Sequence, residues 1–67
     1  MNKSDAEIGM KIIIPIYNYK NKLTKIKKGI ILYKGNNFAT IKTEQGYNES
    51  FFYKDIRKEG EKIYYGE

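Results

Sequence analysis

The fold class of this chain follows from one stretch, Gly29-Ile30-Ile31-Leu32-Tyr33-Lys34-Gly35-Asn36-Asn37-Phe38-Ala39-Thr40-Ile41-Lys42-Thr43. Its two halves are rich in isoleucine, tyrosine, phenylalanine and threonine, which are residue types that favour β-strands. Between the halves, glycine followed by two asparagines is typical of a tight turn, because these residues tolerate a positive φ. The stretch therefore predicts a β-hairpin with strands at residues 29–34 and 38–43.

Strand signals continue on the N-terminal side of this hairpin. Residues 11–17 are rich in isoleucine, and Pro15 has no backbone N–H to donate. We therefore predict a strand that is bent at Pro15 or lies at the edge of a sheet. The lysine-rich segment 18–28 shows no strict alternation and is interpreted as a long loop, with a twisted hairpin arm as the alternative. Residues 1–9 are polar and predict a flexible tail.

On the C-terminal side, residues 44–46 predict a three-residue hairpin loop with Gly46 in the left-handed region. A fourth strand at 47–54, a single helical turn at 55–58 and a fifth short strand at 62–65 complete the pattern. Five short strands without an amphipathic helix predict an all-β protein, a small SH3-like antiparallel barrel over residues 10–67. The aromatic side chains of Phe38, Phe51, Phe52 and Tyr53 are expected to be needed mostly for the thin core of so small a domain.

Several short motifs of the chain resemble small SH3-like proteins of the KOW type, and short barrel proteins found on phages and plasmids of A/T-rich Gram-positive bacteria. These motifs are Lys28-Gly29-Ile30-Ile31, Phe38-Ala39-Thr40-Ile41, Gly46-Tyr47, Ser50-Phe51 and Asp55-Ile56. The resemblance covers about residues 11–58, and the glycine-rich hairpin expected near the start of a KOW motif is missing. It implies contact with RNA or with the transcription and translation machinery, and it transfers no catalytic or binding residue.

The composition excludes several classes of chemistry. The 67 residues include no cysteine and no histidine, which removes disulfides, thiol nucleophiles, imidazole bases and Cys/His zinc sites. We expect a non-enzymatic binding protein with no catalytic residue, no metal and no cofactor. The longest apolar run, at residues 12–16, is far shorter than the roughly 20 residues that span a membrane. No membrane partner is therefore expected, and a cytoplasmic location is predicted.

The net charge of +5 is unevenly distributed along the chain. Residues 1–10 carry −1, residues 11–42 carry +8 with no acid, and residues 43–67 carry −2. Lysines neutralise phosphates and neighbouring tyrosines stack on bases, which is what binding of single-stranded DNA or RNA requires. The predicted binding residues are Tyr19, Lys20, Lys22, Lys25, Lys27, Lys28 and Tyr33.

Two other interpretations of the lysines stay open. The basic segment can dock on an acidic protein surface, as in an adaptor or inhibitor from a mobile element. Alternatively, lysine, asparagine, isoleucine and tyrosine are abundant because their codons are A/T-rich, and the segment is simply solvated. Self-association is a further prediction, in which strand 11–17 pairs with the same strand of a second copy. Pro15 opposes this pairing because it interrupts the edge.

Overall fold

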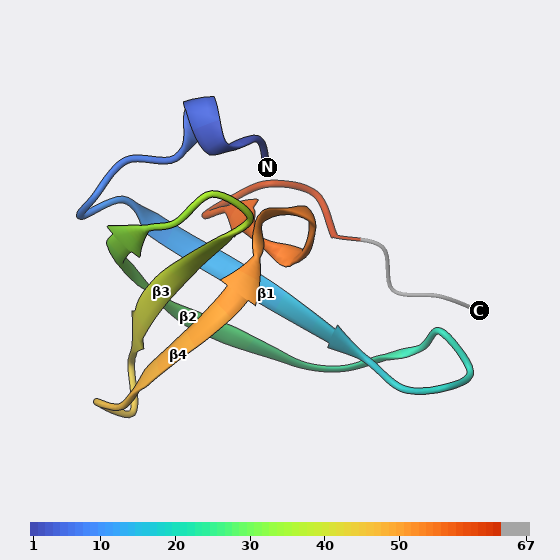
Figure 1. Cartoon of the computed structure of the whole chain (residues 1–67). Coiled ribbons are helices and arrows are strands. Elements are labelled where there is room, and N and C mark those ends of the chain that lie inside the picture. Colours follow the sequence, from blue (N-terminus) through green and yellow to red (C-terminus); the bar gives the residue numbers. More distant parts are fainter. Residues whose placement is uncertain (64–67) are drawn as a thin grey trace.

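The computed structural model describes residues 1–63 and contains one antiparallel sheet of five strands (Figure 1). The strands are β1 (Lys11–Tyr17), β2 (Leu23–Lys34), β3 (Phe38–Thr43), β4 (Asn48–Phe52) and β5 (Arg57–Lys58). Two 3-10 turns, η1 (Lys3–Asp5) and η2 (Tyr53–Asp55), are the helical segments of this part of the chain. The prediction of an all-β protein is therefore confirmed. None of the helical segments in residues 1–63 has the length and apolar character to cross a membrane.

The strand order is β4-β3-β2-β1-β5, so β4 and β5 form the two edges of the sheet. No backbone pairing joins these edges within residues 1–63, and the sheet is open rather than closed. A side-chain contact links two strands that are not neighbours in the sheet. Lys27 on β2 donates to Glu49 on β4 with an Nζ–Oε1 distance of 2.7 Å. The sheet thus curls far enough for β2 and β4 to touch across β3.

The segment predicted as a long loop is mostly strand. β2 begins at Leu23, and only residues 18–22 form the connection to β1. Ile14 pairs with Lys27 and Ile16 with Lys25, so the lysines alternate along a regular ladder. The aliphatic stem of Lys25 can cover sheet surface while its ammonium group reaches water, and Lys27 is bound to Glu49, which explains how so polar a sequence forms a strand. The twisted hairpin arm, the alternative interpretation, is the one observed (Figure 1).

The core is built from isoleucine rather than from aromatic rings. Its largest fully buried side chains are Ile12, Ile14, Ile31, Ile41 and Ile56, and Ala39 and Tyr53 belong to the same cluster. The prediction of an aromatic core is thus wrong for two of four residues. Phe51 is partly buried, whereas Phe38 and Phe52 pair with each other on the opposite face of the sheet. Side chains alternate along a strand, so Ala39 and Phe51 point inward and their neighbours point outward.

The N-terminal segment, predicted to be a flexible tail, packs against the core. Ala6 is fully buried, and Met1 and Met10 contact the buried cluster. Backbone hydrogen bonds tie the segment to β2: the Gly9 N–H donates to the Ile31 carbonyl at 2.7 Å, and the Ile31 N–H donates to the Met10 carbonyl at 3.1 Å. Residues 1–9 are therefore part of the packed structure, and the small side chain of Ala6 is buried in the core cluster.

The turns follow the predictions in part. Gly46 has a φ of 96°, as expected for the hairpin between β3 and β4. The helical turn begins at Tyr53, two residues earlier than predicted, and β5 lies at Arg57–Lys58 instead of 62–65. Tyr64 and Tyr65 of the predicted fifth strand lie outside the described residues. The predicted edge position of strand 11–17 is wrong for its first half, because β1 lies between β2 and β5. Within the described residues β5 pairs only with Ile12 and Ile13, so Pro15 pairs on one side alone, with Ile26 of β2.

Candidate functional site

Strands β2, β3 and β4 share a face that points away from the isoleucine core. The register places Phe38 opposite Phe52, Thr40 opposite Ser50, and Lys42 opposite Asn48. The hydroxyls of Thr40 and Ser50 share a hydrogen bond of 2.9 Å, which fixes these rows on one side of the sheet. We call this side the outer face.

Tyr33 joins the outer face through an irregularity in β2. Ile31 is buried opposite Ile41, and strict alternation would turn Tyr33 toward the core as well. The register shifts between Ile31 and Tyr33, so that Tyr33 lies opposite Thr40. A bulge of this kind redirects the side chain that follows it. The result is that a large ring is placed in solvent.

Three aromatic rings gather at one end of the outer face: Tyr33, Phe38 and Phe52. Their exposed fractions are 56%, 38% and 58%, respectively. The ring centroids of Tyr33 and Phe38 lie 6.1 Å apart with an interplanar angle of 40°. Single exposed rings are common, whereas a group of exposed rings on one face is a candidate binding surface. We call these three residues the aromatic face.

The charged side chains on the outer face of β2, β3 and β4 are lysines. Lys28 and Lys42 are exposed on the outer face, and the Lys54 ammonium lies 5.9 Å from the centroid of the Phe52 ring. No acid occupies an outward position of β2, β3 or β4. Acids begin only at the far end, where Glu44 and Glu59 line a small hollow that also involves Lys28. Lys54 therefore lies beside the aromatic face, whereas Lys42 and Lys28 lie toward the opposite end of the outer face, where the Glu44 N–H donates to the Lys28 carbonyl.

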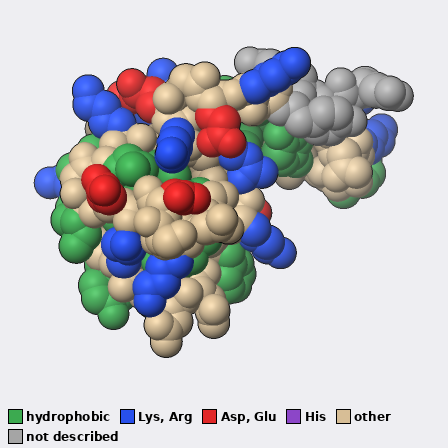
Figure 2. Space-filling view, turned by 90° about the horizontal axis from the view of Figure 1, so that it is seen from above, with side chains coloured by type: hydrophobic (Ala, Val, Ile, Leu, Met, Phe, Trp, Pro, Cys, Tyr) green, Lys and Arg blue, Asp and Glu red, His purple; other side chains and the backbone are tan. Residues whose placement is uncertain are grey.

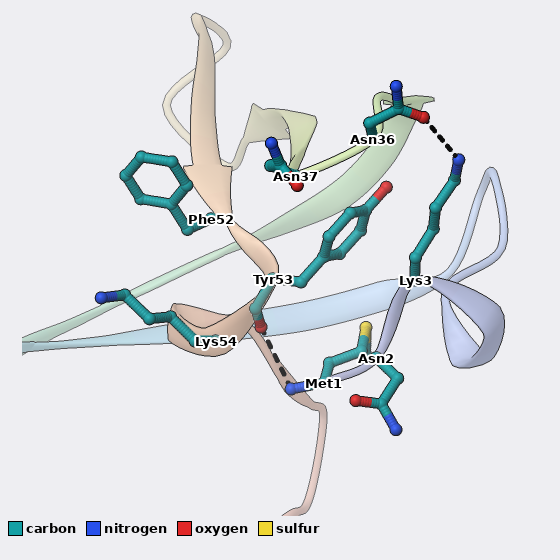
Figure 3. A pocket seen from close by; sticks show the side chains of 8 residues that line it. All are labelled: Met1, Asn2, Lys3, Asn36, Asn37, Phe52, Tyr53 and Lys54. Carbon is teal, nitrogen blue, oxygen red and sulfur yellow. Dashed lines mark hydrogen bonds between the residues drawn. The ribbon is translucent and has the colours of Figure 1, made fainter.

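Two hollows adjoin the aromatic face. One, of about 390 Å³, is lined by Phe38, Ser50, Phe51 and Phe52. The other, of about 620 Å³, is drawn in Figure 3 and is lined by Met1, Asn2, Lys3, Asn36, Asn37, Phe52, Tyr53 and Lys54. In Figure 3 the ammonium groups of Lys3 and Lys54 point in different directions, and the former donates to the Asn36 side-chain oxygen at 3.1 Å. This hollow is thus no compact anion site.

Gly35 and Tyr53 support the aromatic face from behind. A Cβ on Gly35 would lie 2.6 Å from the Phe38 ring, so the glycine leaves room for that ring. The Tyr53 hydroxyl donates to the Gly35 carbonyl at 2.7 Å. Burial raises the pKa of the Tyr53 hydroxyl above its usual value, which keeps this donor protonated.

The tip of the β1–β2 hairpin is a second exposed site. The Asn18 side-chain oxygen accepts hydrogen bonds from the backbone N–H groups of Lys20 and Lys22 at 2.9 and 3.1 Å. Asn21 takes a φ of 59°, which asparagine tolerates better than most residues. Tyr19 is 90% exposed, and the Lys20 ammonium lies 5.6 Å from its ring centroid. The tip therefore presents one ring and two lysines on an ordered turn.

The residues predicted to bind do not form one surface. Tyr19, Lys20 and Lys22 lie together at the hairpin tip, and Lys25 follows near the start of β2. Lys28 is on the outer face, whereas Tyr33 lies at the other end of β2. Lys27 points to the inner side and donates to Glu49, and this hydrogen bond, with a further contribution from the Tyr47 side chain, raises the pKa of the Lys27 ammonium. Its charge is largely compensated by that carboxylate.

Sequence reasoning assigned Phe38 and Phe52 to the core, and it expected Lys42 and Lys54 to matter less for binding than the lysines of segment 18–28. A signal for Phe38 and Lys42 was present, because both alternate with Ala39 and Ile41, which are typical core residues. The position of Tyr33 could not be derived in this way, since the bulge breaks the alternation.

A different side of the molecule carries both signs of charge. Figure 2 shows the side above the N-terminal segment, where acidic and basic side chains are intermixed. A nearby hollow is lined by Asp5, Glu59 and Glu61 together with Lys58. This side therefore has no uniform positive potential.

Comparisons with protein-family models, with curated proteins and with solved structures give no match. Function is therefore inferred from the surface chemistry of the chain itself.

Proposed function

We propose that this protein binds single-stranded nucleic acid on the aromatic face. The observation that carries the proposal is the group of three exposed rings, Tyr33, Phe38 and Phe52, on a sheet face without acids. Bases of a single strand expose both faces and can stack on such rings, whereas a duplex hides its base faces in its own stack. Lys54 beside the rings, and the lysines farther along the outer face, neutralise the phosphates of the bound strand.

The hairpin tip supplies a second, mainly electrostatic contact in this proposal. Lys20, Lys22 and Lys25 are exposed, and none of them forms an ion pair within the described structure. Exposed lysines of this kind attract a phosphate backbone without selecting its sequence. Tyr19 adds one ring to the tip. The basic segment that the sequence predicted to bind thus contributes phosphate contacts in this proposal, whereas the bases stack on the aromatic face of the sheet.

The architecture is compatible with the predicted SH3-like fold. The strand order, with β1 between β2 and β5, and the 3-10 turn η2 before β5 support this proposal. The resemblance to KOW-type and mobile-element barrel proteins implies contact with RNA, which agrees with single-strand binding. A cytoplasmic location and a non-enzymatic role remain predictions.

Binding of a protein partner is the second candidate function. It is favoured by the hollow of about 390 Å³ beside Phe38 and Phe52, which an apolar side chain of a partner can enter. Tyrosine and phenylalanine are also enriched at protein interfaces. A pull-down from lysate with and without nuclease separates the two functions. A partner that survives nuclease supports an adaptor, and loss of all binding supports nucleic acid.

The direct test is a fluorescence-anisotropy titration of a labelled single-stranded oligonucleotide at several salt concentrations. Tyr33→Ala and Phe52→Ala should each weaken binding by about 1–3 kcal/mol, the contribution of one stacked base. Tyr19→Ala separates the sheet from the hairpin tip: its loss of affinity should be smaller, because the tip contributes mainly through its lysines. Circular dichroism checks that each variant is folded.

The salt dependence measures which lysines take part. Lys28, Lys42 and Lys54 alone give a slope of log affinity against log salt near −2, at about 0.7 per phosphate contact. If the three lysines of the hairpin tip also contribute, the slope becomes about −4. Binding no tighter than millimolar at low salt, or a loss confined to Tyr19→Ala, would rule out the aromatic face as the nucleic-acid site.

A further inference from the structure

We infer that the aromatic face selects unstacked, pyrimidine-rich segments of about three nucleotides in preference to purine runs. The inference rests on the proposed function, since it specifies which single strands the same surface accepts. It follows from the way in which the three rings are arranged.

The rings of Tyr33 and Phe38 are too far apart and too tilted to match stacked bases. Their centroids are separated by 6.1 Å, and their planes meet at 40°. Successive nucleotides of one strand in a duplex advance by only about 3.4 Å, with their bases nearly parallel. Two neighbouring bases that each lie flat on one of these rings therefore cannot stay stacked on each other.

Phe52 continues this arrangement on the neighbouring strand. It lies directly opposite Phe38 in the β3–β4 ladder, where paired side chains have Cβ atoms about 5 Å apart. Its ring is 58% exposed and belongs to the edge strand of the sheet. With Tyr33 and Phe38 it offers separate places for about three bases, one for each ring.

The cost of separating the bases decides which strands bind. A purine run loses strong stacking between its own bases when they part, whereas a pyrimidine run loses little and is more flexible. Purine and pyrimidine strands therefore gain the same three base–ring contacts, but the purine strand loses more base–base stacking free energy. The preference should appear as a difference between base classes.

The polar groups on this face add little selection of a particular base. Thr40 and Ser50 hydrogen bond to each other at 2.9 Å, and a hydroxyl can both donate and accept. They can therefore adapt to the edge of any base. The preference between strands therefore depends on the free energy needed to separate their stacked bases.

The test compares a labelled thymidine hexamer with a labelled deoxyadenosine hexamer by fluorescence anisotropy at one low salt concentration. We expect the thymidine hexamer to bind at least about fivefold more tightly, since a difference of this size corresponds to less than one lost stacking contact. Tyr33→Ala should reduce this ratio toward one, because fewer bases must then separate. Tyr19→Ala should change the ratio less than Tyr33→Ala, because its ring lies at the hairpin tip and not on the aromatic face.

Unlabelled thymidine oligomers of increasing length measure the size of the site by competition. The largest gain in affinity per nucleotide is expected up to about three nucleotides, with smaller electrostatic gains beyond that length. Equal binding of the two hexamers, or tighter binding of deoxyadenosine, overturns the inference while single-strand binding stands. If neither hexamer binds, the proposed function itself is wrong.

Discussion

Replacement of Gly29 by alanine should destabilise this protein more than any other glycine-to-alanine change in β2 or its turns. Gly29 lies in β2 opposite Thr43 of β3. A Cβ at this position would lie 2.3 Å from the Lys42 carbonyl oxygen and 2.6 Å from the Ile41 Cγ2. The first of these atoms belongs to the backbone, so relief requires the two strands to move apart by about 1 Å where the core is closely packed.

The expected cost is about 3 kcal/mol, at the upper end of the range for overpacking a core. A domain of this size has a total stability of about 3–10 kcal/mol, so the variant should lose a large part of it. The midpoint of thermal unfolding should fall by roughly 12–24 °C. Urea and thermal unfolding followed by far-UV circular dichroism measure both quantities.

Gly46→Ala is the matched control. Gly46 has a φ of 96°, but a Cβ added at this turn would have no other atom within 4 Å. Its cost should be about 1–2 kcal/mol, from backbone strain alone. If Gly29→Ala is as stable as the wild type, or loses less stability than Gly46→Ala, β2 and β3 do not approach each other as closely at Gly29 as these distances require.

Three further predictions concern other parts of the structure. Gly35→Ala should displace the Phe38 ring, which can move more easily than backbone, and should weaken oligonucleotide binding in anisotropy titrations with a stability loss of only about 1 kcal/mol. The pKa of Lys27 is raised above the ordinary lysine value of 10.5, so the hydrogen bond to Glu49 stabilises the fold to its full extent at any pH below 10.5. This stabilisation is lost as the pH rises through the raised pKa of the folded protein. Alkaline unfolding curves should therefore be shifted to lower pH in Glu49→Gln. Ala6→Asp should cost about 3 kcal/mol or more in urea unfolding, because it buries a charge in the core; wild-type stability would show that residues 1–9 do not pack against it.

The all-β class and the central hairpin could be predicted because the local signals agree with each other. Strand-forming residues on both sides of Gly35 predicted β2 and β3 at their common end, and Gly46 takes the positive φ that its turn requires. The start of β2 could not be predicted in the same way. Lysines at 25, 27 and 28 are ordinary for a loop, and only the ladder with the isoleucines of β1 makes this segment a strand.

The candidate site could be predicted only in fragments, because its geometry depends on tertiary structure. Tyr33 was selected for its position beside a basic segment, but a bulge and not that segment places its ring in solvent. Lys27 was selected for its charge, and its carboxylate partner lies on a strand 22 residues away in sequence. Phe38 and Phe52 were assigned to the core because aromatic residues usually fill small cores, while isoleucines take that place here.

The central claim is that single-stranded nucleic acid binds on the aromatic face of the sheet. The most direct measurement is a titration of isotope-labelled protein with an unlabelled thymidine hexamer, followed residue by residue in ¹H–¹⁵N correlation NMR spectra. We predict that the largest shift changes fall on Tyr33, Phe38, Phe52 and their neighbours Thr40 and Ser50, with smaller changes at residues 18–22. Shift changes confined to the hairpin tip, or none at saturating oligonucleotide, would contradict it.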